Sequence, residues 1–137
     1  MSGFLRNDVI KIVVDTNILF MAWHNSSGKA AIVLDKAREG KIILYAPDSV
    51  KEEIVRVFKR HGQAEEQIES FLADFPIIWI EKDIYNIFLN KTKVKHNADK
   101  PVEALSLALG CSILSADNHF NICKNRVDID KLLREFG

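Results

Sequence analysis

Two aspartates follow short apolar runs near opposite ends of the chain. Asp15 comes directly after the run at residues 10–14, and Asp117 follows residues 112–115 after one intervening residue. Apolar, β-branched runs of this length are typical of buried strands. The carboxyl ends of such strands are where open α/β sheets bind ligands. The spacing therefore predicts that both carboxylates lie at one edge of a sheet. Alternatively, Asp15 can cap the next helix, and Asp117-Asn118 can form an ordinary turn, in which these residue types are common.

One of two adjacent glutamates can reach the same edge of the sheet. A helix is expected to open at Pro47-Asp48-Ser49, and a helical wheel advances about 100° per residue. Glu53 falls on the flank of the apolar sector of this helix, whereas Glu52 points away and should be solvated. The sector comprises Val50, Ile54, Val57 and Phe58. The alternative for Glu53 is a surface acid that benefits from the helix dipole.

A third group of polar residues forms a stripe on an otherwise apolar helix. Asp99, Glu103 and Ser106 are spaced i, i+4 and i+7. Polar side chains on a mostly buried helix need hydrogen-bonding partners, so the stripe is a candidate part of the site. The alternatives are that Asp99 caps the helix ahead of Lys100-Pro101 and that Glu103 is simply exposed.

Carboxylates that converge in one pocket repel each other unless a cation neutralises them. The candidates are Asp15, Glu53, Asp99 and Asp117. A set of oxygen ligands suits Mg²⁺ or Mn²⁺ rather than zinc, and the four histidines show no zinc-binding spacing. Such metals support phosphodiester cleavage by activating water and stabilising the leaving oxygen. The chain has no glycine-rich phosphate loop, no Gly-x-Ser-x-Gly motif and no motif for a nucleophilic cysteine.

The elements that must position these residues alternate between strand and helix. Strands are expected at residues 10–14, 41–45, 77–80 and 112–115, with a short fifth strand at 126–129. Helices are expected from about residue 17, around 30–37, from 47 to about 61, over 64–75, around 84–88, from 101 to 109, and at 131–136. This rhythm predicts a mainly parallel sheet of four to five strands with helices on both faces.

Composition places the chain among ordinary soluble proteins. It has 137 residues, 47% of them hydrophobic and 28% charged, which fits a single domain over residues 1–137. No apolar stretch approaches a membrane span, and residues 1–8 lack a signal-peptide core, so a cytoplasmic location without membrane association is expected. Two cysteines fit neither a disulfide framework nor a zinc motif.

The charge balance limits the mode of nucleic-acid binding. Lysines plus arginines and acidic residues both number 19, which argues against a protein that is basic overall and binds nucleic acid by bulk charge. An acidic metal site with a basic rim remains compatible with this balance. Lys91, Lys93 and Lys95 are the candidate rim for substrate binding, and a solvated loop is their alternative.

In the order and spacing of these motifs the chain resembles PIN-domain proteins, a family of small metal-dependent ribonucleases. The motifs are Val13-Val14-Asp15-Thr16-Asn17, Pro47-Asp48-Ser49-Val50 with Glu53, Asp99-Lys100-Pro101 eleven residues before Gly110, and Ile113-Leu114-Ser115-Ala116-Asp117. The resemblance covers nearly the whole chain. It implies a three-layer α/β/α fold and Mg²⁺- or Mn²⁺-dependent hydrolysis of RNA, either as the toxin of a toxin–antitoxin pair or in RNA processing.

The resemblance also implies roles for individual residues and partners. It assigns Asp15, Glu53, Asp99 and Asp117 to catalysis and metal binding, and a helper role to Asn17 or Ser115. Many relatives carry another acid just before the third motif, where Asn97 and Ala98 stand here. Either Glu103 compensates for this departure or only one metal binds firmly. The implied partners are RNA, a second copy of the chain and, for a toxin, an antitoxin protein.

Two other functions are considered. The first is a non-catalytic RNA-binding or scaffold module that kept the fold. The second is a phosphatase of the haloacid-dehalogenase type, which also places an aspartate at the end of its first strand. That family needs a second aspartate two residues later, where this chain has Asn17.

Overall fold

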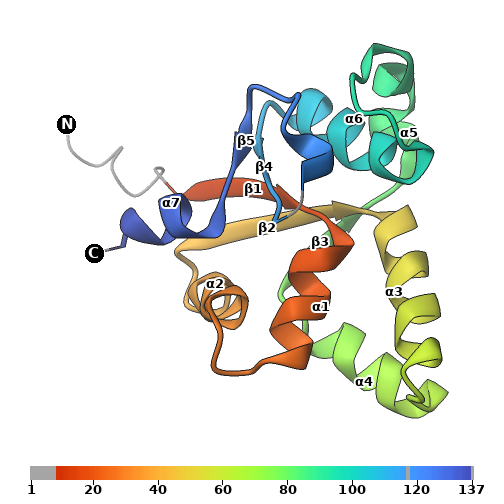
Figure 1. The fold of residues 1–137 in the computed structure, drawn as a ribbon, viewed down its shortest axis with the longest axis vertical. Helices are drawn as coiled ribbons and strands as arrows, with labels where there is room; N and C mark the ends of the chain where they lie inside the picture. The colour runs from red at the N-terminus through yellow and green to blue at the C-terminus, as the bar shows by residue number, and fades with distance from the viewer. Residues whose placement is uncertain (1–8, 117, 137) are drawn as a thin grey trace.

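A five-stranded parallel sheet forms the centre of the protein (Figure 1). The structure is a computed structural model that describes residues 9–116 and 118–136, so Asp117 lies outside the described residues. The strand order is β3-β2-β1-β4-β5. The strands are β1 (Ile10–Val14), β2 (Ile42–Pro47), β3 (Ile77–Ile80), β4 (Ser112–Leu114) and β5 (Arg126–Val127). The parallel sheet predicted from the sequence is confirmed.

The central strand, β1, explains where the site lies. Its residues Ile12, Val13 and Val14 are at most 2% exposed, as expected for a strand covered on both faces. Val13 pairs with Tyr45 of β2 on one side, and Val14 pairs with Leu114 of β4 on the other. The chain therefore continues to one side of β1 first and later crosses to the other. The carboxyl ends of β1 and β4 flank the point where the strand order reverses, which is the usual ligand site of such sheets.

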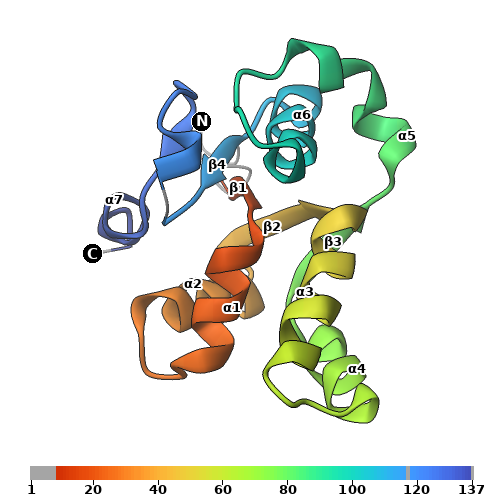
Figure 2. The same ribbon diagram turned by 45° about the vertical axis from the view of Figure 1, so that its right-hand side comes forward.

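Helices cover both faces of the sheet. Figure 1 shows α1 and α2 on one side of the sheet, and α5 and α6 on the other. Figure 2 shows α3 and α4 together beside α1, on the same side of the sheet as α1 and α2. Their bounds are α1 (Thr16–His24), α2 (Lys29–Arg38), α3 (Asp48–Arg60), α4 (Glu65–Asp74), α5 (Lys82–Tyr85), α6 (Lys100–Leu109) and α7 (Ile129–Arg134). Short 3₁₀ turns are η2 (Asn86–Lys91), η3 (Asn97–Asp99) and η4 (Asn118–Phe120). No helix in the described ranges has the length and apolar character that crossing a bilayer requires.

Local sequence signals set the ends of the helices that carry site residues. Pro101 lies in the first turn of α6, where its missing N–H costs nothing. Gly110 ends α6 with a φ of 65°, a left-handed conformation that favours glycine. On α3, Val50, Ile54 and Phe58 are buried, and the Phe58 ring lies 4.5 Å from that of Trp23 on α1. This packing fixes the side of α3 that faces the site.

Two segments differ from the elements expected from the sequence. The helix expected at residues 84–88 is one turn of α5 followed by the 3₁₀ turn η2, and Ile84 and Ile87 are 52% and 72% exposed. Tyr85 is the buried anchor there, and its hydroxyl donates to Asp48 Oδ1 at 2.6 Å. At the carboxyl end, α7 begins at Ile129 because Asp128 caps it, accepting from the Lys131 amide at 2.7 Å.

Candidate active site

A cavity of about 280 Å³ lies at the carboxyl end of β1. Its walls come from the start of α1, the second turn of α3, the segment leading into α6, and η4. The lining residues are Asp15, Thr16, Asn17, Glu53, His96, Ala98, Asp99, Val102 and His119. Larger hollows of about 520 and 750 Å³ lie elsewhere. Among the described residues that line these three hollows, carboxylates from the end of β1, from α3 and from the start of α6 come together only in the cavity of about 280 Å³.

Hydrogen bonds hold Asp15 in the cavity. It is 5% exposed. Its Oδ1 accepts from the Ile18 amide at 3.2 Å, and its Oδ2 accepts from Ser115 Oγ at 2.9 Å. Asp15 therefore caps α1 and lines the cavity at once, so its two readings from the sequence are compatible. Ser115 is fully buried just beyond β4 and fixes the orientation of the carboxylate.

Glu53 approaches Asp15 from the neighbouring helix. Its Oε1 accepts from Thr16 Oγ1 at 2.5 Å, a contact across 37 residues of sequence. Glu53 is half-buried on α3 while Glu52 is exposed, in agreement with the helical wheel. Thr16 thus ties the Glu53 carboxylate to the residue that directly follows Asp15.

Asp99 lies beside two histidines that the sequence analysis set aside. Its Oδ2 is 3.0 Å from His119 Nδ1, and the ring centres of His119 and His96 are 4.2 Å apart with a 31° angle between planes. Both histidines line the cavity. No local spacing signals this pair, because η4 and the segment before η3 meet only through the fold. The adjacent motif ending at Asp117 was the one available hint for His119.

Two solved structures share this fold over most of their length. One is VapBC2 from Rickettsia felis bound to a DNA fragment from their promoter, with a TM-score of 0.61, 16% identity, and coverage of 87% of this chain and 97% of the other. The second is the PAE2754 protein of Pyrobaculum aerophilum, with a TM-score of 0.60, 13% identity, and coverage of 93% and 89%. The protein has a PIN-like fold. A scan of protein-family models gives no match, and a search of curated proteins gives none.

Glu103, a predicted supporting residue of the candidate site, lies in a different environment from the other acids. It is 3% exposed, and its Oε1 accepts from the amides of Lys93 and Val94 at 2.6 and 3.0 Å. It is absent from the cavity lining. The pKa of the Cys123 thiol is raised to about 12, mainly because the thiol is buried and also because the Glu103 carboxylate lies nearby. In this structure Glu103 braces the segment before η3, which carries His96.

The remaining residues predicted for the candidate site are largely exposed. Asn17 is exposed at the mouth of the cavity. Lys91 is exposed at the end of η2, and its Nζ lies 5.5 Å from the centre of the Phe88 ring. Lys93 and Lys95 are exposed on the segment between η2 and η3. Among the described residues, no three His, Cys, Asp or Glu side chains are grouped closely enough to hold a metal ion. Asp117, the fourth predicted acid, is outside those residues.

Proposed function

We propose that this protein is a divalent-metal-dependent endoribonuclease. The observation that supports the proposal best is the shared cavity of Asp15, Glu53 and Asp99, three acids from separate elements at the carboxyl edge of a PIN-like sheet. The proposal adds Asp117 as the fourth acid. Several acids that line one hollow at this position favour chemistry on a phosphate ester with the help of a cation rather than direct binding of an anion.

The donor atoms fit Mg²⁺ or Mn²⁺. All the acids supply carboxylate oxygens, the ligands that these hard cations prefer, and no cysteine is among the described residues that line the cavity. Asp15, Glu53, Asp99 and Asp117 would hold the ion. When bound, such an ion activates water and stabilises the leaving oxygen in phosphodiester hydrolysis.

The polar neighbours of the acids act by orienting them. Ser115 and the Ile18 amide fix the Asp15 carboxylate, and Thr16 fixes Glu53. Such hydrogen bonds hold the oxygens in place before substrate arrives, which lowers the cost of reorganisation during the reaction. We assign a positioning role to Ser115. Asn17, at the mouth of the cavity, is placed to contact substrate or water.

RNA is proposed to approach along the basic segment beside the cavity. Lys91, Lys93 and Lys95 are solvent-exposed there. Contacts of this kind attract the phosphate backbone without reading sequence. They also offset the repulsion between an RNA strand and the acidic cavity.

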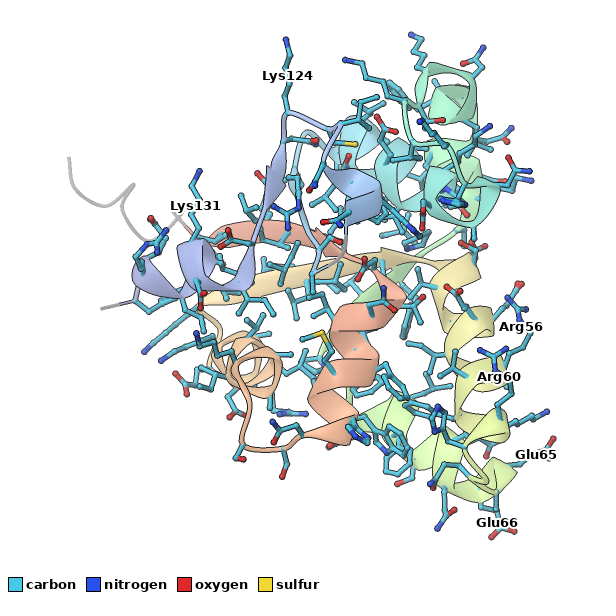
Figure 3. The ribbon with its side chains drawn as sticks, in the orientation of Figure 1. Arg56, Arg60, Glu65, Glu66, Lys124 and Lys131 are labelled. Atoms are coloured by element: carbon cyan, nitrogen blue, oxygen red, sulfur yellow. The ribbon has the colours of Figure 1, made fainter. Side chains whose placement is uncertain are left out.

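The assembly proposed for the protein is a homodimer in the cytoplasm. The hairpin of α3 and α4 carries opposite charges on exposed side chains: Arg56 and Arg60 point outward from α3, and Glu65 and Glu66 from α4 (Figure 3). A surface with both charges can complement itself about a two-fold axis. Light scattering on the purified protein measures its oligomeric state, and a monomer at high concentration would exclude the dimer.

The similarity to VapBC2 supports a toxin role with an antitoxin partner over general RNA processing.

Cleavage of a mixed pool of single-stranded and structured RNA tests the proposed function. We expect internal cuts with Mg²⁺ or Mn²⁺ and none with EDTA, because the proposed reaction depends on water activated by the bound cation. Binding of the pool without any cleavage under either metal would favour the non-catalytic scaffold instead.

A further inference from the structure

A second, smaller hollow adjoins the acidic cavity. It has a volume of about 210 Å³ and is lined by Lys95, His96, Asn118, His119 and Ile122. His96 and His119 also line the acidic cavity, so the two hollows share a wall made of this ring pair. We call the smaller one the histidine-side hollow. An RNA backbone that crosses the acidic cavity on this side would next pass the histidine-side hollow.

The side chains of the histidine-side hollow combine three kinds of contact. His96 and His119 offer exposed aromatic rings, and Ile122 offers an apolar surface that is 53% exposed. Asn118 presents an amide that can both donate and accept, and the Asn121 Nδ2 contacts its Oδ1 at 3.4 Å. Lys95 adds a positive charge at the rim. Rings, an apolar wall, an amide and a cation are the groups that proteins use to hold an unpaired base and its phosphate.

The size of the hollow limits what it can hold. Pockets for drug-sized ligands span about 300–1,000 Å³, so a hollow below that range suits a fragment such as one planar base. Bases in an A-form duplex are paired and stacked within the helix, and side chains cannot enter its narrow major groove. Only a base turned out of a single strand, loop or bulge can therefore fill the hollow.

We propose that the histidine-side hollow binds one unpaired nucleobase of an RNA substrate beside the cleaved bond, and that Asn118 and Ile122 set the base preference at that position. This inference rests on the proposed ribonuclease function and names its substrate class as single-stranded RNA. In this proposal the ring pair and Ile122 contact the faces of the base, and Asn118 contacts its edge. Lys95 contacts the adjoining phosphate.

The test is the cleavage pattern on single-stranded RNA randomised around the cut, with Mn²⁺ present. The parent should prefer particular bases at one position next to the cut. Asn118→Ala and Ile122→Ala should each flatten that preference while the cut position relative to the backbone stays the same. An abasic nucleotide at that position should slow the parent about tenfold, in line with the loss of one stacked base, and should slow the variants less.

Matched controls come from an exposed isoleucine and an exposed asparagine that line neither hollow. Ile84 is 52% exposed on α5, and Asn86 is exposed at the start of η2, so Ile84→Ala and Asn86→Ala should keep the parental pattern. If Asn118→Ala and Ile122→Ala also keep it while cleavage still requires metal, the subsite is wrong and the ribonuclease function stands.

A binding measurement separates the two hypotheses if no RNA is cleaved. Fluorescence anisotropy in EDTA then compares a labelled single strand with a duplex of the same sequence. The subsite predicts tighter binding of the single strand and about tenfold weaker binding by Asn118→Ala or Ile122→Ala. Equal affinities for the parent and both variants would overturn the subsite independently of catalysis.

Discussion

Asp15→Asn should lower metal-dependent RNA cleavage by more than about 100-fold, since even residues that only support a metal ligand cost 10–100-fold when changed. The substitution keeps the shape of the side chain and its capping contact with the Ile18 amide, so the fold should survive. RNA should still bind, and binding should tighten because one negative charge near the phosphates is lost. Initial cleavage rates and anisotropy on the same RNA measure both effects.

Glu52→Gln is the matched control for Asp15→Asn. It also removes one carboxylate near the site, but Glu52 is exposed on α3 and absent from the cavity lining. Its cleavage rate should stay within about twofold of the parent, because exposed charges are screened. If Asp15→Asn cleaves RNA as well as Glu52→Gln does, the activity comes from another site or from a contaminant.

Glu103→Ala should lower the free energy of unfolding by about 2–5 kcal/mol. The buried carboxylate accepts from the amides of Lys93 and Val94, and a buried donor left without an acceptor costs about 1–3 kcal/mol. Urea denaturation monitored by circular dichroism measures the change. Glu103→Gln keeps an acceptor oxygen and should lose less. Exposed Glu66 provides the surface control, and Glu66→Ala should be nearly neutral.

Two further readouts separate the bracing role of Glu103 from metal binding. The stabilisation of the protein by Mn²⁺ should persist in Glu103→Gln, because that carboxylate does not line the cavity. The Cys123 thiol should become more acidic in the same variant, since a neighbouring negative charge no longer opposes its ionisation. Loss of the Mn²⁺ response in Glu103→Gln, with an unchanged thiol, would instead assign Glu103 to the metal.

The strands and the edge where the acids gather follow directly from the sequence. Apolar runs such as residues 10–14 have few alternatives to a buried strand, and parallel strands bring their carboxyl ends to one edge. The wheel separates Glu53 from Glu52 because packing of Val50, Ile54 and Phe58 fixes the rotation of α3. The helix predicted from apolar periodicity at residues 84–88 was wrong, because Tyr85 is buried there while Ile84 and Ile87 are exposed.

Contacts between distant segments are the part that the sequence did not reveal. Thr16 looks like an ordinary turn residue until α3 brings Glu53 to its hydroxyl. The ring pair of His96 and His119 joins segments with no local signal. The polar stripe of Glu103 and Ser106 did predict buried partners, but only the fold shows that these are the amides of Lys93 and Val94 and the side chain of Asn125.

Anomalous scattering from crystals soaked in Mn²⁺ tests the central claim most directly, because it locates the ion without reference to activity. The predicted result is a Mn²⁺ peak in the cavity lined by Asp15, Glu53 and Asp99, with Asp117 among its ligands, and no such peak in crystals of Asp15→Asn. A cavity without Mn²⁺ at millimolar concentration, or a peak bound only by residues elsewhere, would contradict the account.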